Sequence, residues 1–339
     1  MTACQSCFDL EKKGDFNKNM IGFCFLVIDD LPHHKIWAKY LKGSPHVAIV
    51  HSKFMPMKHK PSDFCQTKLS GVLQPEHGDI RCAMALIELL KEGLQANEEI
   101  SHFIFLSETC LPVVPLQTLE QELDAIGEKS IIHFTHPCPR SEHGARYNFV
   151  DTSLLPRLFS QEDWIFHPTW IVVSRPHAHL LVQSKQLQTF YRAFQRVPFV
   201  DEHFIGTVLY SILGKQQFSN QIDTSEKTFA NWKEYERTPD GKIHPKTYRK
   251  WDPALNTKSS RYWFVRKVKC EVQWGDLFNG RKPRGMPIWC IILIVLAFML
   301  VLALVIFMAC KRSGTFPCVR EKPGFTFQKH SHGVSTPGP

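Results

Sequence analysis

The chain has 339 residues, of which 43% are hydrophobic and 12% are aromatic, so it can bury a sizeable core and is not a disordered protein. Its formal charge is +9, but the basic residues are scattered and form no dense basic helix with interleaved aromatic residues, so we expect no nucleic-acid partner. The positive surplus suits an anionic small-molecule substrate or a membrane surface.

The first third of the chain alternates between predicted strands and predicted helices. Buried-strand patterns occur at 23–28, 46–52 and 102–107, and helical patterns at 33–43, 79–94 and 116–127. This alternation predicts an α/β domain with a mostly parallel central sheet. Ligands of such sheets bind beyond the carboxyl ends of the strands, which places His51 and the segment 107–112 on the binding side. For His51 alone, a solvated loop histidine is the more common outcome.

An Asp-Glu-His triplet lies between two apolar runs in "VPFVDEHFIGTVLY" at 197–210. The residues from Phe204 to Leu213 repeat with helical spacing, so Asp201 and Glu202 are predicted to occupy the cap and first turn of a helix. Carboxylates there suit the positive end of the helix dipole. Taken alone, the triplet is most simply interpreted as structural, and a catalytic carboxylate is the alternative.

Several catalytic motifs are absent from the sequence. It contains no dinucleotide-binding or P-loop glycine pattern, no Gly-x-Ser-x-Gly elbow and no His-Glu-x-x-His helix. Asp-x-Asp, with which many nucleotide-sugar transferases hold a metal, is absent too. If the protein handles a nucleotide sugar, another positive charge must stabilise the departing diphosphate, and we expect neither a metal nor another cofactor.

Five sequence blocks follow "HFIFLSETCLP" in a fixed order. They are "DWIFHPTWIVVSRPHA", "VDEHFIGTVL", "TFANW", "GKIHPKTY" and "YWFVRKV". In this order they resemble the core-2/I-branching enzymes of glycosyltransferase family 14, particularly the plant-type branch. The likeness extends over residues 22–268, nearly the whole body of the chain.

The resemblance implies a GT-A-type domain that is inverting and metal-independent. The glutamate of the Asp-Glu segment is the catalytic base of this family, and here it falls on Glu202. Basic groups near the end of the domain bind the UDP diphosphate; Lys267 matches one, with Arg266 beside it. A further arginine lies upstream in the family, and both Arg249 and Arg261 are candidates for it.

The remaining candidate residues are assigned to the two substrates. We expect His51 on the donor side, and Glu108, Trp232 and Asp201 on the acceptor side. The Trp232 ring can stack on the apolar face of a sugar. Glu108 is the alternative base if Glu202 is only structural.

The implied function is transfer of a sugar from a UDP-sugar to a hydroxyl of a glycan or glycoprotein, with N-acetylglucosamine as the preferred donor sugar. Two alternatives stay open. The same fold could use UDP-xylose or UDP-glucuronic acid, or the protein could be an inactive, membrane-tethered glycan binder.

A charge-free stretch at 287–310 is flanked by "RKPR" and "KR" and is long enough to cross a bilayer. We therefore expect a transferase domain at 22–275, between an N-terminal segment at 1–21 and a linker at 276–286, then one transmembrane helix at 287–310 and a disordered tail at 311–339. Family members face the Golgi lumen, so a single-pass protein of the Golgi or another endomembrane is expected. The flanking charges lean only slightly towards a cytosolic tail, which leaves the orientation open.

Overall fold

The computed structural model describes residues 20–54, 68–70, 73–135, 142–155, 159–239, 241, 243–278, 296, 299–303 and 308. The chain forms one compact unit over Met1–Gly280 and a second over Arg281–Pro339. Helix α8 (Trp274–Phe278) crosses the expected domain boundary at residue 275, and its Leu277 is buried. The expected segment at 1–21 lies almost wholly outside the described residues, and the tail at 311–339 entirely so.

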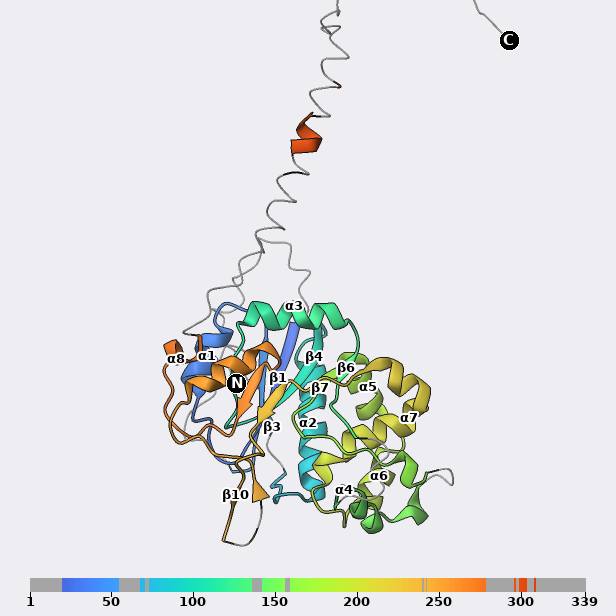
Figure 1. Ribbon diagram of the computed structural model, residues 1–339. Coiled ribbons are helices and arrows are strands. Elements are labelled where there is room, and N and C mark those ends of the chain that lie inside the picture. The colour runs from blue at the N-terminus through green and yellow to red at the C-terminus, as the bar shows by residue number, and fades with distance from the viewer. Residues whose placement is uncertain are drawn as a thin grey trace, which may run out of the picture. The chain divides into compact units, whose positions relative to one another are not determined.

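The described part of the first unit is built on a seven-stranded sheet in the order β3-β2-β1-β4-β7-β6-β8 (Figure 1). Strands β1 to β4 run parallel, as do β6 and β8, whereas β7 is antiparallel to both of its neighbours. The expected α/β fold with a mostly parallel central sheet is therefore confirmed, and it is compatible with a GT-A-like domain. The strands are β1 Met20–Val27, β2 Val47–Ser52, β3 Lys68–Ser70, β4 Ile100–Ser107, β6 Ser130–Ile131, β7 Val172–Ser174 and β8 Ile222–Asp223.

All six elements predicted in the first third are present, as β1, β2, β4 and three helices. The longer helices are α1 His34–Leu41, α2 Ile80–Ala96, α3 Leu116–Ile126, α5 Arg175–Gln183, α6 Leu187–Ala193 and α7 Phe204–Gln221. Shorter turns are α4 Glu142–Ala145, η3 Arg146–Phe149, η4 Thr152–Leu154, η5 Gln161–Asp163, η6 Val200–Glu202 and η7 Pro253–Ser260.

Both faces of the sheet are buried, because successive side chains of a strand point to opposite sides. On one face Phe23 and Phe25 of β1 pack with Trp37 of α1 and with α3. On the other face Phe103 and Phe105 of β4 pack with α2, α5 and α7. The near-continuous apolar strands that the sequence shows are thus explained by two-sided burial.

A second sheet of three strands lies beside the first and carries the last of the sequence blocks. Its order is β5 (Leu111–Pro112), β12 (Phe264–Arg266) and β9 (Thr228–Ala230). Val265 pairs with Leu111, and the N–H of Val268 donates to the carbonyl of Thr109 at 3.0 Å. This register brings Arg266 and Lys267 to the segment that follows β4, although the two lie far apart in sequence.

Helix α7 is interrupted at Gly214, whose φ of 73° lies in the left-handed region. The apolar repeat from Phe204 to Leu213 therefore fills only the first part of the helix, and its buried side chains join the core beneath α2 and α5. The predicted helix exists, and it extends to Gln221 after the kink.

Within the described residues, no helix has both the length and the apolar character that a membrane crossing requires. The expected span at 287–310 lies mostly outside this part of the chain, which includes only 296, 299–303 and 308.

Candidate active site

Glu202 is the last residue of the short turn η6 and precedes helix α7 instead of lying in its first turn. Helix α7 begins at Phe204, with His203 at the N-cap position and no side-chain cap. The side chain of Asp201 accepts a hydrogen bond from Thr169 Oγ1 at 2.8 Å. The prediction that Asp201 and Glu202 cap α7 is therefore wrong, because three residues of a 3₁₀ turn separate the preceding loop from the helix.

Arg146 is the direct partner of Glu202. Its Nη1 lies 2.7 Å from Glu202 Oε2, and its guanidinium is covered by the ring of Phe199, with Cζ 4.8 Å from the ring centroid. Burial raises the pKa of Glu202, the negative charge of Asp201 raises it further, and Arg146 opposes both. Among the described residues Oε1 has no hydrogen-bond partner, so the carboxylate keeps one oxygen available for a proton.

Sequence reasoning did not find Arg146. It lies in η3, 56 residues before Glu202, and an arginine in a short irregular segment is ordinarily exposed. Here only 7% of the residue's surface is exposed. No local pattern marks that burial, so only the folded chain reveals the pair.

Two neutral histidines hold the backbone around Glu202. His203 Nδ1 lies 2.9 Å from Ile165 O, and its ring stacks on Trp164 with centroids 4.3 Å apart. Burial lowers the pKa of His203 to about 2 and that of His167 to about 4. The neutral His167 can therefore accept a hydrogen bond at Nε2 from the Gly206 N–H, at 3.1 Å. The Glu202 carbonyl accepts in turn from the His167 N–H.

Arg266 faces the carboxylates from β12. Its Cζ lies 4.3 Å from the Trp170 ring centroid, and its pKa is lowered by burial against the opposing effects of Cys110, Glu108, Glu202 and Asp201. Its Nε is buried without a hydrogen-bond partner among the described residues, and the same holds for Asp201 Oδ1. Buried polar atoms are ordinarily satisfied, so these two atoms indicate a place for a polar ligand.

Lys267 follows Arg266 and contacts a different element. Its Nζ lies 3.2 Å from His244 Nδ1 in β11 (Ile243–His244). Burial lowers the pKa of Lys267 to about 8, and the charges of Arg266 and Lys269 act in the same direction. Burial also raises the pKa of Glu108, which these cations oppose. A cationic cluster thus lies beside Glu108 at the end of β4.

The other predicted residues differ in their burial and in their partners. His51 is fully buried in β2, with Nε2 3.0 Å from Leu73 O, and burial lowers its pKa. It is therefore not the solvated loop histidine that is most common at such a position. Trp232 lies after β9 and is 53% exposed, as an accessible stacking surface requires. Arg261 is exposed, with its guanidinium over the Tyr262 ring.

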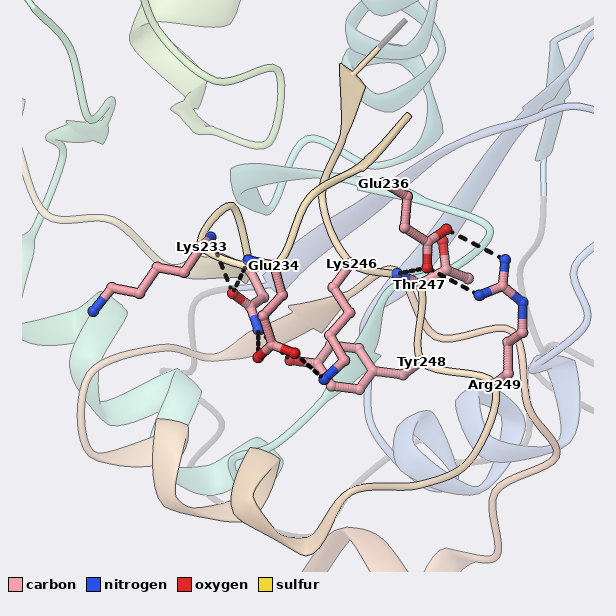
Figure 2. Close-up of polar contacts among 8 residues, drawn as sticks. Lys233, Glu234, Glu236, Lys246, Thr247, Tyr248 and Arg249 are labelled. Atoms are coloured by element: carbon pink, nitrogen blue, oxygen red, sulfur yellow. Dashed lines mark hydrogen bonds and ion pairs between the residues drawn. The ribbon is translucent and has the colours of Figure 1, made fainter. Parts of the chain in front are cut away.

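Arg249 has a carboxylate partner of its own. Its Nη1 and Nη2 donate to the two carboxylate oxygens of Glu236 at 2.9 and 3.3 Å, and its side chain is 71% exposed (Figure 2). This bond lowers the pKa of Glu236 to about 2. Arg249 therefore holds a surface ion pair, whereas Arg266 occupies the buried position next to the carboxylates.

Among the described residues, no group of three or more His, Cys, Asp and Glu side chains is arranged to hold a metal ion. The carboxylates Glu202, Asp201 and Glu108 all act on the charge of Arg266, and Glu108 also acts on that of Lys267. Among the described residues, Glu202 Oε1 and Asp201 Oδ1 have no hydrogen-bond partner. Such a set can accept a proton on one side and stabilise a leaving anion on the other.

Comparison with known proteins gives one family. The model of the family described as Branch, Core-2/I-Branching enzyme, matches residues 21–259. The match includes Glu202 and Arg146 and ends shortly before Arg266 and Lys267. No curated protein matches the chain.

Proposed function

The chain belongs to the Core-2/I-branching enzyme family, a family of glycosyltransferases that act on glycans, and from this premise we propose that it transfers a sugar from a UDP-sugar to a glycan hydroxyl with inversion. The observation that carries the proposal is the carboxylate of Glu202, paired through Oε2 to Arg146 and unpaired at Oε1 among the described residues. We propose N-acetylglucosamine as the donor sugar.

In the proposed reaction the acceptor hydroxyl attacks the anomeric carbon in line with the bond to the diphosphate. A carbon–oxygen bond forms to the acceptor, the bond to the diphosphate oxygen breaks, and UDP leaves with the bonding electrons. Glu202 takes the hydroxyl proton. General-base help of this kind contributes about 10²–10⁴ in rate.

Lys267 and Arg266 are proposed to stabilise the departing diphosphate. Lys267 is partly buried beside Glu108, and the Arg266 guanidinium lies over the Trp170 ring. A guanidinium and an ammonium at this point supply charge-assisted hydrogen bonds without a metal. Arg266 is proposed for this role as the residue beside Lys267; Arg249, a candidate for the separate upstream arginine, is bound to Glu236 in this structure. The absence of Asp-x-Asp from the sequence supports metal independence.

Acceptor contacts are proposed for Asp201, Glu108 and Trp232. Asp201 Oδ1 is buried and unpartnered in the described chain, while Oδ2 is occupied by Thr169. A sugar hydroxyl that donates to Oδ1 would satisfy it. The exposed Trp232 offers an apolar face, as acceptor rings require. His51 is proposed on the donor side; its buried side chain contacts the carbonyl of Leu73.

We further propose that residues 287–310 cross a membrane once and tether the enzyme in the Golgi or another endomembrane. The charge-free sequence and its basic flanks support this. If the full-length protein is released from membranes by alkaline carbonate alone, the anchor is disproved. Protease added to intact vesicles tests the side of the membrane on which the body lies.

A transfer assay tests the proposed activity. Full-length protein in detergent is incubated with UDP-N-acetylglucosamine, UDP-xylose or UDP-glucuronic acid, with a mixture of glycan acceptors, and UDP release is compared with and without acceptor. Acceptor-dependent UDP release from the first donor supports the proposal. Release from only one of the other donors corrects the sugar, and binding of glycans without release from any donor identifies an inactive binder.

A further inference from the structure

We propose that a surface hairpin positions Lys267 for the diphosphate, and that His244 is the positioning residue through which it acts. The hairpin consists of β10 (Glu236–Arg237) and β11 with their flanking residues 231–235 and 245–249. The inference rests on the proposed function, because it assigns a partner to the lysine that holds the donor. Nothing in the family match extends to Lys267, which lies beyond residue 259.

The hairpin holds the main chain on both sides of Lys267. The N–H of Tyr248 donates to the carbonyl of Lys267 at 2.8 Å, and the N–H of Lys269 donates to the carbonyl of Tyr248 at 3.0 Å. Tyr248 is buried and forms a bridge with Val268. The backbone position of Lys267 therefore depends on the residues that end the hairpin.

His244 holds the side chain of the same lysine. A lysine has a long, flexible side chain, and its ammonium carries donors only. Nδ1 of His244 lies 3.2 Å from Lys267 Nζ, where it can accept one of these N–H groups and leave the others for phosphate oxygens. The side chain is thereby ordered before the ligand arrives, which reduces the entropy lost on binding.

His244 is itself fixed by the pairing of the two strands. It lies opposite Glu236 in the register of β10 and β11. Glu236 accepts two hydrogen bonds from Arg249 and one from the Thr247 N–H at 3.2 Å (Figure 2). Arg249 therefore acts on the donor lysine from a distance, through Glu236 and His244.

A second ion pair ties the base of the hairpin together. Lys246 Nζ lies 2.7 Å from Glu234 Oε2 (Figure 2). Asn231 Nδ2 donates both to Glu234 Oε1 and to the Tyr248 hydroxyl. Exposed ion pairs of this kind contribute little to global stability. Two such ion pairs lie around one pair of strands next to Lys267. We infer that they fix the local geometry of the hairpin.

The experiment measures UDP affinity by calorimetry on the full-length protein in detergent, together with the melting temperature. His244→Leu should weaken UDP binding by about two- to tenfold, as expected for the loss of one hydrogen bond. His244→Asn, which keeps an acceptor near the position of Nδ1, should restore most of the affinity. Arg249→Gln should weaken binding in the same direction. Lys91→Gln, which breaks an exposed pair with Glu88 on α2, is the matched control and should change nothing.

A double-mutant cycle separates positioning from general damage. In a Lys267→Gln background, His244→Leu should cause no further loss, because the group that it positions is gone. The inference is overturned if His244→Leu binds UDP like the wild type, or if its effect persists undiminished in the Lys267→Gln background. Failure of the proposed function looks different: the wild type would not bind UDP, or Lys267→Gln would bind it normally.

Discussion

Arg146 Nη1 lies 2.7 Å from Glu202 Oε2 and 3.4 Å from His203 Nε2, so one buried guanidinium contacts both residues that precede helix α7. Burial, and to a lesser extent the charge of Arg146, lowers the pKa of His203 to about 2, so Nε2 of the neutral ring accepts the hydrogen bond from Arg146. The carboxylate is thereby oriented, and part of the effect of its burial is offset.

Glu202→Gln should abolish transfer and leave the fold intact. The amide is isosteric and can still accept from Arg146, but it cannot take up the proton of the acceptor hydroxyl. We expect turnover to fall by about 10²–10⁴, with UDP affinity and melting temperature close to those of the wild type. Near-normal turnover in a variant that melts early would mean that the carboxylate is structural, and Glu108 would be the next candidate base.

Arg146→Gln should move the acid limb of the pH–rate profile to higher pH. The pKa of Glu202 is raised by burial, and Arg146 opposes this rise; without the cation the pKa rises further. Because the base must be ionised, activity is lost as the pH falls through this pKa, and the loss begins at higher pH in the variant. The profile of kcat/KM against pH measures the shift.

Arg146→Lys keeps the charge and should shift the profile less than Arg146→Gln. The exposed Arg192 on α6 provides the control, since Arg192→Gln leaves the environment of Glu202 unchanged. Identical acid limbs in the wild type and Arg146→Gln would show that Arg146 does not govern the ionisation of the base.

Lys267→Ala should weaken UDP binding, because a hydrogen bond to a charged group is worth about 1.5–3 kcal/mol. The pKa of Lys267 is lowered to about 8, so the ammonium is lost as the pH rises through this value. UDP affinity of the wild type should therefore decline above about pH 8, and the variant should lack this decline. Calorimetry over a pH series tests both statements; unchanged affinity at neutral pH would mean that another residue holds the diphosphate.

Chelation should leave the activity unchanged, since the positive charges at the donor site belong to the chain. UDP release is measured before and after dialysis against EDTA, with and without added manganese. Activity that EDTA abolishes and manganese restores would show that a metal, and not Lys267 with Arg266, neutralises the leaving group.

Gly206→Ala should destabilise the protein and displace His167. A Cβ at this position would lie 2.7 Å from His167 Cδ2 and 2.8 Å from Ile165 Cγ2, closer than packed atoms allow. Overpacking of this kind costs about 1–3 kcal/mol in the free energy of unfolding. Ser219→Ala, on the exposed part of the same helix, is the control, and an unchanged unfolding free energy for Gly206→Ala would contradict the packing described.

Much of the fold could be predicted because its signals are local. Strands β1, β2 and β4 are buried on both faces of the sheet, so their sequences are nearly continuous apolar runs. Helix α2 has its buried residues at helical spacing. The same patterns failed at Asp201, where the sequence predicts a helix cap and the structure has a 3₁₀ turn. A carboxylate before an apolar repeat predicts a helix cap. Here a 3₁₀ turn precedes the helix, and the Asp201 carboxylate accepts a hydrogen bond from Thr169 instead.

The sequence by itself determined the α/β alternation, and the family resemblance carried by its ordered blocks made Glu202 and Lys267 candidates. Only the tertiary structure decided what those residues touch. Arg146 reaches Glu202 across 56 residues and His244 reaches Lys267 across 23. A contact at such separation depends on how strands and loops pack and leaves no periodic trace in the chain. The same holds for burial, which separates the surface pair of Arg249 and Glu236 from the unpartnered Nε of Arg266 beside the carboxylates.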